Sequence, residues 1–353
     1  MKFQTLFLHV PLQEKILFTK NLALALRSGI SLVNSLKMIR NQARTRSFKK
    51  IIDVLIDDTN RGAFLSVSLG KFTGIFGELF VNVIKVAETS GTLPENLAYL
   101  GDELKKKADL RKKVRGAMVY PMIVLLATIA IAASMVLFVF PKILPLFASF
   151  KGQLPLTTRM LIAISDVITN HGLALLFGII ATVVGFRLLL RIGAIRYMYH
   201  RALLTLPMVG SAVINFNMAN MTRTLGLLLR SGVQIIESIS ITGATLTNLV
   251  YKRELIAAAN HVRQGEFFSK YLYRDQKKFP PILVNMIEVG ENTGNLNENL
   301  NYLAEYYENE VDDFVKNLSS ILEPILLLVM GGIVGFIALS FITPIYQLTR
   351  SIG

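Results

Sequence analysis

The stretch FGELFVNVIKVAETSGTLPENLAYL (residues 76–100) occurs a second time as FPPILVNMIEVGENTGNLNENLNYL (residues 279–303). Thirteen of the twenty-five positions are identical, and the copies lie 203 residues apart. Composition alone would give roughly one or two matches. The same spacing relates further motifs: Arg27-Ser28-Gly29 to Arg230-Ser231-Gly232, and Gly62-x-Phe64-x-Ser66 to Gly265-x-Phe267-x-Ser269. The chain therefore contains two copies of one domain of about 130 residues, too few copies for a solenoid.

The composition indicates helical domains attached to a few membrane spans. Of the 353 residues, 52% are hydrophobic, and the mean hydropathy is +0.48. This value is high for a soluble protein but low for a multispanning carrier. The chain has no cysteine, which excludes disulfides, cysteine-ligated zinc and thiol catalysis. Its four histidines are scattered without metal-ligand spacing, so the sequence predicts no metal and no cofactor.

Two uncharged segments, residues 116–141 and residues 324–349, are each long enough to cross a membrane, which takes about 20 apolar residues. They are equivalent segments of the two repeats. A third apolar segment, residues 172–190, lies between the repeats and has no counterpart. Since the two copies of one soluble domain must fold in the same compartment, the unpaired span is needed to bring the chain back between them.

Basic residues predict the orientation of these spans. Seven of them precede the first span: Lys105, Lys106, Lys107, Arg111, Lys112, Lys113 and Arg115. Fewer follow it, which places the N-terminus in the cytoplasm and the C-terminus outside. The net charge of +14 would also suit nucleic acid. The basic cluster borders a membrane span and has no interleaved aromatic residues, so we expect lipid contact and no nucleic-acid binding.

The repeats themselves are predicted to be helical. Leu32, Leu36 and Ile39 mark one helix face at 3.6-residue spacing, and no alternating stretch is long enough to suggest a sheet. Gly29 and Gly232 interrupt apolar helical patterns and indicate sharp turns. The fold class is thus an all-α membrane protein with two homologous cytoplasmic helical-bundle domains and three transmembrane helices. The expected segments are residues 1–115 (repeat 1), 116–141 (first span), 142–171 (extracytoplasmic loop), 172–190 (second span), 191–320 (repeat 2) and 321–349 (third span).

The repeated motif supplies the candidate functional residues. Gly91 and Gly294 suit the end of a helix, so a structural turn is the alternative to a functional role. Glu88 and Glu291 stand in the last turn of a helix, where a negative charge opposes the helix dipole. Each glutamate therefore requires a partner: a cation, a basic side chain or another protein.

Enzymatic motifs are absent from the sequence. It contains no Walker A motif, no G-x-G-x-x-G, no G-x-S-x-G elbow and no H-E-x-x-H. Ionisable residues are nearly absent from the spans, which argues against an ion-coupled transporter. In the last span, Gly331 and Gly335 form a small-xxx-small pattern suited to close helix packing. The sequence thus predicts a protein that is not an enzyme.

Four elements resemble the duplicated domain of the inner-membrane platform proteins, PilC of type IV pili and GspF of type II secretion. They are LxxLLRSGV (residues 225–233), G-x-x-x-S (residues 265–269), F-P-P (residues 279–281) and VGE-x-x-G-x-L (residues 289–296). The resemblance covers residues 15–349. Two features depart from the family pattern: Phe76-Gly77-Glu78 stands where F-P-P is usual, and the chain begins almost at the first repeat.

The resemblance implies a non-enzymatic platform in the cytoplasmic (inner) membrane. Its expected partners are a hexameric assembly ATPase, pilin or pseudopilin transmembrane helices, membrane lipids and further copies of the chain. Candidate residues for coupling to partners are Glu88, Gly91, Glu291, Gly294, Arg27 and Arg230. Pilus assembly is the leading interpretation. A type II secretion platform and, from another class, a membrane transporter or channel are the alternatives.

Overall fold

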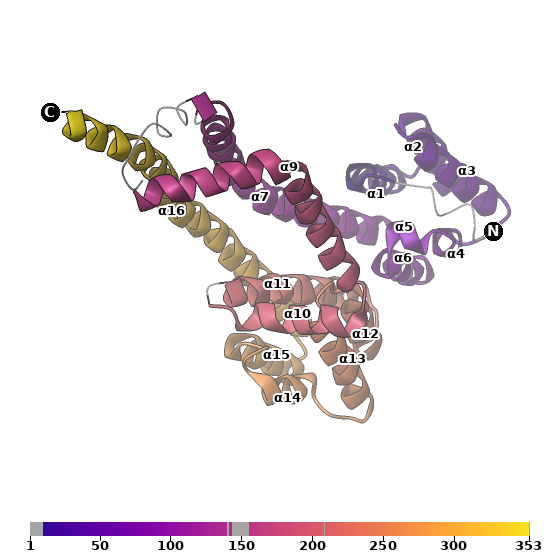
Figure 1. Ribbon diagram of the computed structural model, residues 1–353. Helices are drawn as coiled ribbons and strands as arrows, with labels where there is room; N and C mark the ends of the chain where they lie inside the picture. The colour runs from indigo at the N-terminus through magenta and orange to yellow at the C-terminus, as the bar shows by residue number, and fades with distance from the viewer. Residues whose placement is uncertain (1–9, 140, 143–154, 208, 353) are drawn as a thin grey trace. The chain divides into compact units, whose positions relative to one another are not determined.

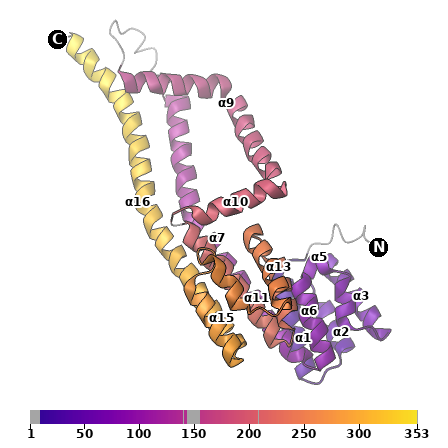
Figure 2. The same cartoon turned by 90° about the horizontal axis from the view of Figure 1, so that it is seen from below.

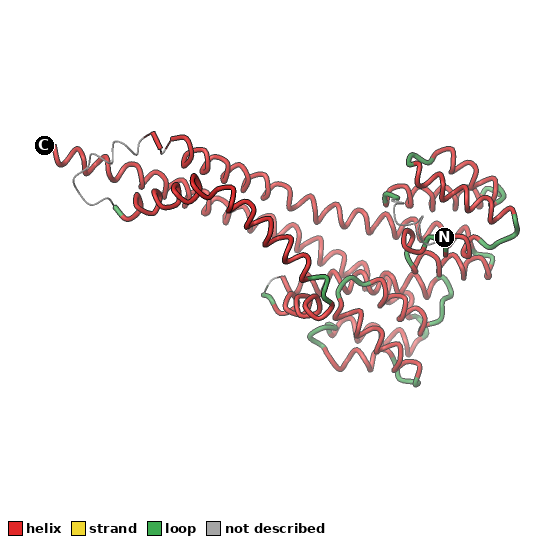
Figure 3. Tube along the Cα trace, turned by 45° about the vertical axis from the view of Figure 1, so that its right-hand side comes forward, coloured by secondary structure: helices red, strands yellow, loops and turns green. Residues whose placement is uncertain are grey.

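The computed structural model describes residues 10–139, 141–142, 155–207 and 209–352, which form helices joined by short turns (Figure 1). No strand occurs among these residues (Figure 3), in agreement with the predicted all-α class. The first repeat and the segment after it contain α1 (Leu12–Arg27), α2 (Leu32–Gln42), α3 (Arg46–Asn60), α4 (Leu65–Gly70), α5 (Thr73–Phe76), α6 (Glu78–Ser90), α7 (Leu93–Ser134) and the π-helix η1 (Met135–Val139). The remainder contains α9 (Leu156–Leu189), α10 (Gly193–Thr205), α11 (Val209–Arg230), α12 (Ile235–Thr245), α13 (Leu249–Arg263), α14 (Phe268–Leu272), the 3₁₀ turn η2 (Tyr273–Asp275), α15 (Pro281–Thr293) and α16 (Leu296–Ile352).

The helix boundaries repeat with the sequence. The bounds of α2, α3 and α6, shifted by 203 residues, are the bounds of α12, α13 and α15. Local capping explains several of these starts: the Thr45 hydroxyl accepts from Phe48 N at 3.3 Å, and Asn248 Oδ1 accepts from Val250 N at 2.9 Å. Gly29 and Gly232 have φ angles of 79° and 86°, which confirms the predicted turns.

The chain divides into two compact units. Unit 1 consists of Met1–Lys112 and Arg196–Asp312, and unit 2 of Lys113–Ile195 and Asp313–Gly353. Both repeats therefore contribute their helical domains to unit 1. In repeat 1, α1, α2 and α3 lie side by side (Figure 2).

Each repeat has its own apolar core. Phe18, Phe48 and Phe80 are buried in that of repeat 1, and Tyr251 and Phe279 in that of repeat 2. The core of repeat 1 also includes four residues from α11, α12 and the turn between them: Leu227, Leu228, Val233 and Ile241. The two domains therefore share a packed contact, which we call the seam.

Unit 2 contains the apolar segments. By length and composition, two helical segments could cross a membrane, Val119–Val139 and Leu296–Pro344. Two bent helix pairs raise this number to four at most: one is the two halves of α9, and the other is α10 with α11. The second pair has another explanation for its apolar character, because α11 supplies Met218, Leu225 and Leu228 to the buried interior of unit 1.

Helix α9 begins earlier than the sequence suggested. We expected a loop over residues 142–171, but from Leu156 onward this segment is helical and continuous with the predicted second span. Residues 143–154 lie outside the described part of the chain. Within unit 2, Thr158 Oγ1 donates to the Ser340 carbonyl at 2.9 Å, and Ser165 Oγ donates to the Val136 carbonyl at 3.4 Å. These hydroxyls attach the N-terminal half of α9 to η1 and α16.

Candidate functional site

The two motif glutamates bind backbone amides of their own repeats. Glu88 Oε1 accepts from Leu65 N at 2.5 Å, and its Oε2 accepts from Ser66 N at 2.8 Å. Glu291 makes the equivalent pair with Phe268 N at 2.7 Å and Ser269 N at 2.9 Å. Each carboxylate thereby ties the end of α6 or α15 to the start of α4 or α14.

This arrangement supplies a helix cap from a distance. The residues at the N-cap positions of α4 and α14, Phe64 and Phe267, make no side-chain cap hydrogen bond. The first amides of a helix have no intrahelical acceptor, and a carboxylate satisfies them with charge-assisted bonds. The sequence predicted that each glutamate needs a partner, and these amides are that partner.

Gly91 and Gly294 end their helices in the left-handed region, with φ angles of 71° and 75°. A Cβ added at either position would meet no atom within 4 Å. Glycine is therefore required by the backbone conformation and not by lack of space. This supports the structural interpretation of the two glycines.

The two candidate arginines differ in their surroundings. Arg230 lies at the seam, with its Cζ 3.7 Å from the centroid of the Tyr99 ring, and it also hydrogen-bonds the Tyr99 hydroxyl. Arg27, its equivalent in repeat 1, is exposed at the end of α1. Both arginines are exposed, and among the described residues only Arg230 has a partner across the seam.

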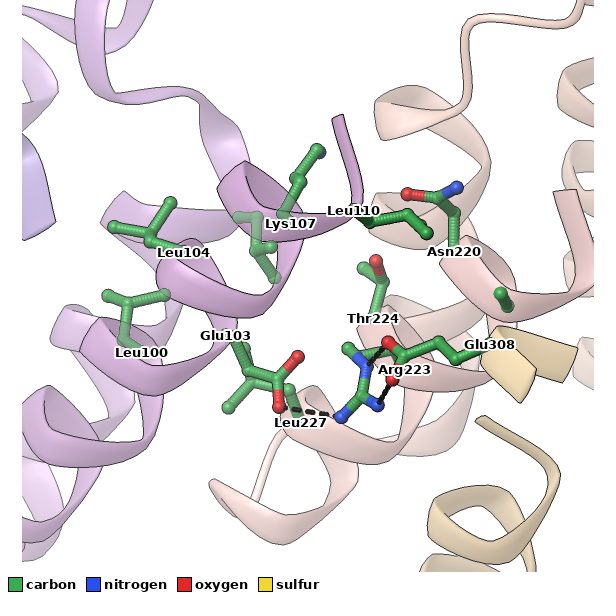
Figure 4. A pocket seen from close by; sticks show the side chains of 12 residues that line it. Leu100, Glu103, Leu104, Lys107, Leu110, Asn220, Arg223, Thr224, Leu227 and Glu308 are labelled. Atoms are coloured by element: carbon green, nitrogen blue, oxygen red, sulfur yellow. Dashed lines mark hydrogen bonds and ion pairs between the residues drawn. The ribbon is translucent and has the colours of Figure 1, made fainter. Parts of the chain in front are cut away.

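A half-buried ionic cluster lies beside this contact (Figure 4). Arg223 on α11 donates from Nε to Glu308 Oε1 at 2.5 Å, and its Nη2 lies 2.5 Å from Glu308 Oε2. Its Nη1 lies 3.0 Å from Oε1 of Glu103, which is on α7 of repeat 1. The adjoining cavity of about 70 Å³ has a mainly apolar lining that includes Leu100, Leu104 and Leu227. Arg223 thus makes a two-point pair inside repeat 2, and its contact with Glu103 joins the two repeats.

Burial affects the two sides of this cluster differently. Burial raises the pKa of the Glu103 carboxyl, and the nearby Arg223 charge opposes this only in part. Burial also acts to lower the pKa of Arg223, but the hydrogen bond to Glu308 and the charges of Glu103 and Glu308 outweigh it, so that pKa is raised. Arg223 is therefore firmly charged, whereas the charge on Glu103 is incompletely compensated.

The sequence interpretation missed Arg223, Glu103, Glu308 and Tyr99. One signal was available, because the repeat equivalents of Arg223 and Glu103 are Lys20 and Tyr306. Positions that differ between two otherwise similar copies mark where the copies have different neighbours. Lys20 pairs instead with Asp102 inside repeat 1, at 2.6 Å.

The last candidates lie in unit 2. A Cβ added at Gly331 or Gly335 would meet no atom within 4 Å of it, so both glycines have open space at their Cα atoms. Among the described residues, no group of three or more histidine, cysteine or acidic side chains has the arrangement of a metal site.

Comparison with known proteins agrees with the duplicated domain found in the sequence. The profile of the family described as "Type II secretion system (T2SS), protein F" matches residues 18–141 and 221–344, again 203 residues apart. The type IV pilus assembly protein PilC of Thermus thermophilus is 33% identical over 342 residues, which is 97% of this chain and 84% of that protein.

Relatives named for type II secretion and relatives named for type IV pilus assembly are similar to this chain to about the same degree. Type II secretion system protein F of Vibrio cholerae is 30% identical over 334 residues, 95% of this chain and 82% of that protein. The type IV pilus assembly protein PilC of Pseudomonas aeruginosa is 30% identical over 339 residues, 96% of this chain and 90% of that protein. The two matched copies and these full-length similarities show that the chain belongs to the T2SSF family, the family of type II secretion system protein F, with homologues named PilC and GspF.

Proposed function

We propose that this chain is the inner-membrane platform protein of type IV pilus assembly, coupling a cytoplasmic assembly ATPase to the extraction of pilins from the membrane. The observation that carries the proposal is the doubled domain, which aligns over nearly the whole chain with proteins named for pilus assembly. The role is mechanical, and the chain catalyses no reaction.

The packing of the two repeats supports a topology with three spans. Both helical domains belong to unit 1 and share the seam, which supports placing them on the same side of the membrane. Each leads into an apolar segment, the first over residues 116–141 and the last over residues 321–349. The chain must cross once more between them, over residues 172–190 within α9. An odd number of spans puts the C-terminus opposite the N-terminus.

The orientation follows from charge. Lys105, Lys106 and Lys107 are exposed on α7 just before the first span, and basic residues at this position favour the cytoplasmic side and anionic lipid headgroups. Unit 1 is then the part available to the hexameric ATPase. The spans contact pilin transmembrane helices, lipids and further copies of the chain, with Gly331 and Gly335 as a site of close helix packing.

Glu88, Gly91, Glu291, Gly294, Arg27 and Arg230 remain our candidates for coupling to partners. The glutamates and glycines would act indirectly, because each one fixes the position of a helix end at the surface of unit 1. Arg27 would act directly, since its guanidinium is exposed.

The second candidate function is the platform of a type II secretion system, which assembles a pseudopilus for protein export. A specific observation favours it, because relatives named for type II secretion are about as similar as those named for pilus assembly. The deciding experiment is therefore a deletion strain of the source organism, examined by electron microscopy for surface filaments and by analysis of secreted proteins.

We expect the deletion to remove filaments and the intact gene to restore them. Loss of a secreted protein with normal filaments would move the assignment to type II secretion. Normal filaments together with normal secretion would contradict both assignments. An immunoblot of the membrane fraction controls for the amount of protein in each complemented strain.

A further inference from the structure

The seam inside unit 1 has two unlike faces. The face of repeat 2 is formed by the end of α11, the following turn and α12, with Leu227 and Ile241 buried against repeat 1. The face of repeat 1 is formed by α6 and α7, where Tyr99 lies under Arg230. Val86 on α6 adjoins the Gly232 turn, since a Cβ on this glycine would lie 3.6 Å from Val86 Cγ1.

Repeat 1 carries a second version of the α11–α12 face, and the described residues leave it uncovered. Leu24 is equivalent to Leu227, but its exposed fraction is 67% against 6%. Met38 is equivalent to Ile241, and the exposed fractions are 47% and 7%. Together with Arg27, these residues form what we call the free α1–α2 face.

Repeat 2 likewise carries a second version of the α6–α7 face. Val289 on α15 is equivalent to Val86 and is 50% exposed. Tyr302 on α16 is equivalent to Tyr99 and is 55% exposed. We call this pair the free α15–α16 face. An exposed valine, leucine, methionine and tyrosine at positions that are covered in the other copy indicate missing partners.

We infer that the free α1–α2 face of one chain binds the free α15–α16 face of a second copy, with Arg27 stacked on Tyr302 as Arg230 stacks on Tyr99. The occupant is a second copy because the two free faces have the residue equivalents of a contact that the chain already makes internally. The free faces carry the same residue types as the internal contact, with Arg27 equivalent to Arg230 and Tyr302 equivalent to Tyr99. This deepens the proposed function by naming the surface through which copies associate, and cross-linking tests it whether or not filaments form.

The ionic part of the seam is not repeated between chains. Lys20 takes the position of Arg223 and is paired with Asp102 of its own repeat, and Tyr306 takes the position of Glu103. The contact between copies is therefore apolar and aromatic, and we expect it to resist moderate salt. It is also head-to-tail, because the two faces differ.

The absence of cysteine from the chain allows a direct test in membranes. One tagged chain carries Arg27→Cys, a second chain with a different tag carries Tyr302→Cys, and the two are produced together. A short bismaleimide is expected to join them into a dimer that contains both tags. Arg27→Cys alone and Tyr302→Cys alone are expected to give at least tenfold less dimer.

The matched control uses the internal contact. A chain with both Tyr99→Cys and Arg230→Cys is expected to react with the bismaleimide within itself, which protects both thiols from later labelling without producing a dimer. Adding Leu24→Glu to the Arg27→Cys chain is expected to reduce the mixed dimer at least tenfold. Val67→Glu, at an exposed apolar position on α4 outside the free α1–α2 face, is expected to leave the dimer unchanged.

Absence of the mixed dimer while the internal pair reacts would overturn the inference. So would equal dimer from Arg27→Cys alone, since that result indicates a symmetric contact between identical faces. Equal losses from Leu24→Glu and Val67→Glu would also overturn it, because the free α1–α2 face would then have no special part in the association.

Discussion

Glu88 and Glu291 are residues whose role depends on segments more than 20 positions away. Each carboxylate caps a short helix whose own N-cap position holds a phenylalanine. The repeated E-x-x-G-x-L and G-x-F-x-S motifs are therefore two halves of one contact. This accounts for the occurrence of both motifs in both copies.

Replacing Glu88 by alanine is expected to lower the free energy of unfolding by about 1–2 kcal/mol, because two amides at the start of α4 lose their acceptor. Thermal unfolding of the purified full chain in detergent measures the change. Glu305→Ala on the exposed side of α16 is the matched control, expected to change stability by less than about 0.5 kcal/mol. Equal effects of the two substitutions would contradict the capping role.

Gly91 allows a separate test of backbone conformation. Alanine at φ 71° is expected to cost about 1–2 kcal/mol of stability, and Gly91→Asn less, because asparagine tolerates the left-handed region better. The same unfolding measurement compares them. Gly70→Ala is the control, since Gly70 also has open space around its Cα but no positive φ. A cost that is the same at both glycines would show that conformation is not the cause.

The glycine turns could be predicted at the residue scale because a helix end depends on neighbouring residues. The glutamate caps could not, because the sequence gives the charge but not the amides that a distant segment brings to it. The partners that the sequence suggested for Glu88, namely a cation, a basic side chain or another protein, did not include the backbone of α4.

At the scale of elements, the seam joins α11 and α12 of repeat 2 to α6 and α7 of repeat 1. Arg223 is held by two carboxylates, and Glu308 provides two of its three contacts. Arg223→Met is therefore expected to lower the free energy of unfolding by about 2 kcal/mol, because Glu103 and Glu308 stay half-buried without their cation. Arg223→Lys is expected to recover only part of this loss, since lysine lacks the planar two-point geometry. Unfolding midpoints of the three proteins give the order, and equal stability of Arg223→Met and the unchanged chain would contradict it.

Glu103 gives the seam a pH dependence. Its pKa is raised in the folded state, so protonation favours folding. Its contribution is fully present below the unfolded value near 4.5 and is lost as pH rises through the folded pKa. Glu103→Gln is therefore expected to flatten the stability profile above pH 4.5 and to cost little at pH 7. Unfolding midpoints measured from pH 4.5 to 8 check this, and a large loss at pH 7 would show that the Arg223 pair dominates.

The all-α class and the duplicated domain could be predicted, because the repeat and the apolar periodicity are both visible in the sequence. The start of α9 at Leu156 was not predicted. Arg159 and Asp166 are charged residues inside this helix, N-terminal to the apolar segment that the sequence marks as a span. The seam also could not be predicted, because Arg223 and Glu103 are 120 positions apart in the sequence.

At the scale of the whole molecule, the proposed topology has three spans and both repeats in the cytoplasm. Single cysteines test it, because the chain has none of its own. Lys151→Cys and Gly353→Cys are expected to react with a membrane-impermeant maleimide in intact spheroplasts. Lys37→Cys and Lys270→Cys, both exposed on unit 1, are expected to react only after permeabilisation. Labelling of Lys37 and Lys270 variants on opposite sides would contradict the shared compartment of the repeats.

The seam also has a consequence for stoichiometry. If chains associate head-to-tail as inferred, any closed ring holds an even number of domains, whatever the number of chains. Two kinds of joint then alternate around it, one within a chain with the Arg223 cluster and one between chains without it. Such a ring comes apart at the joints between chains first, so its smallest intermediate is a two-domain block and never a lone domain.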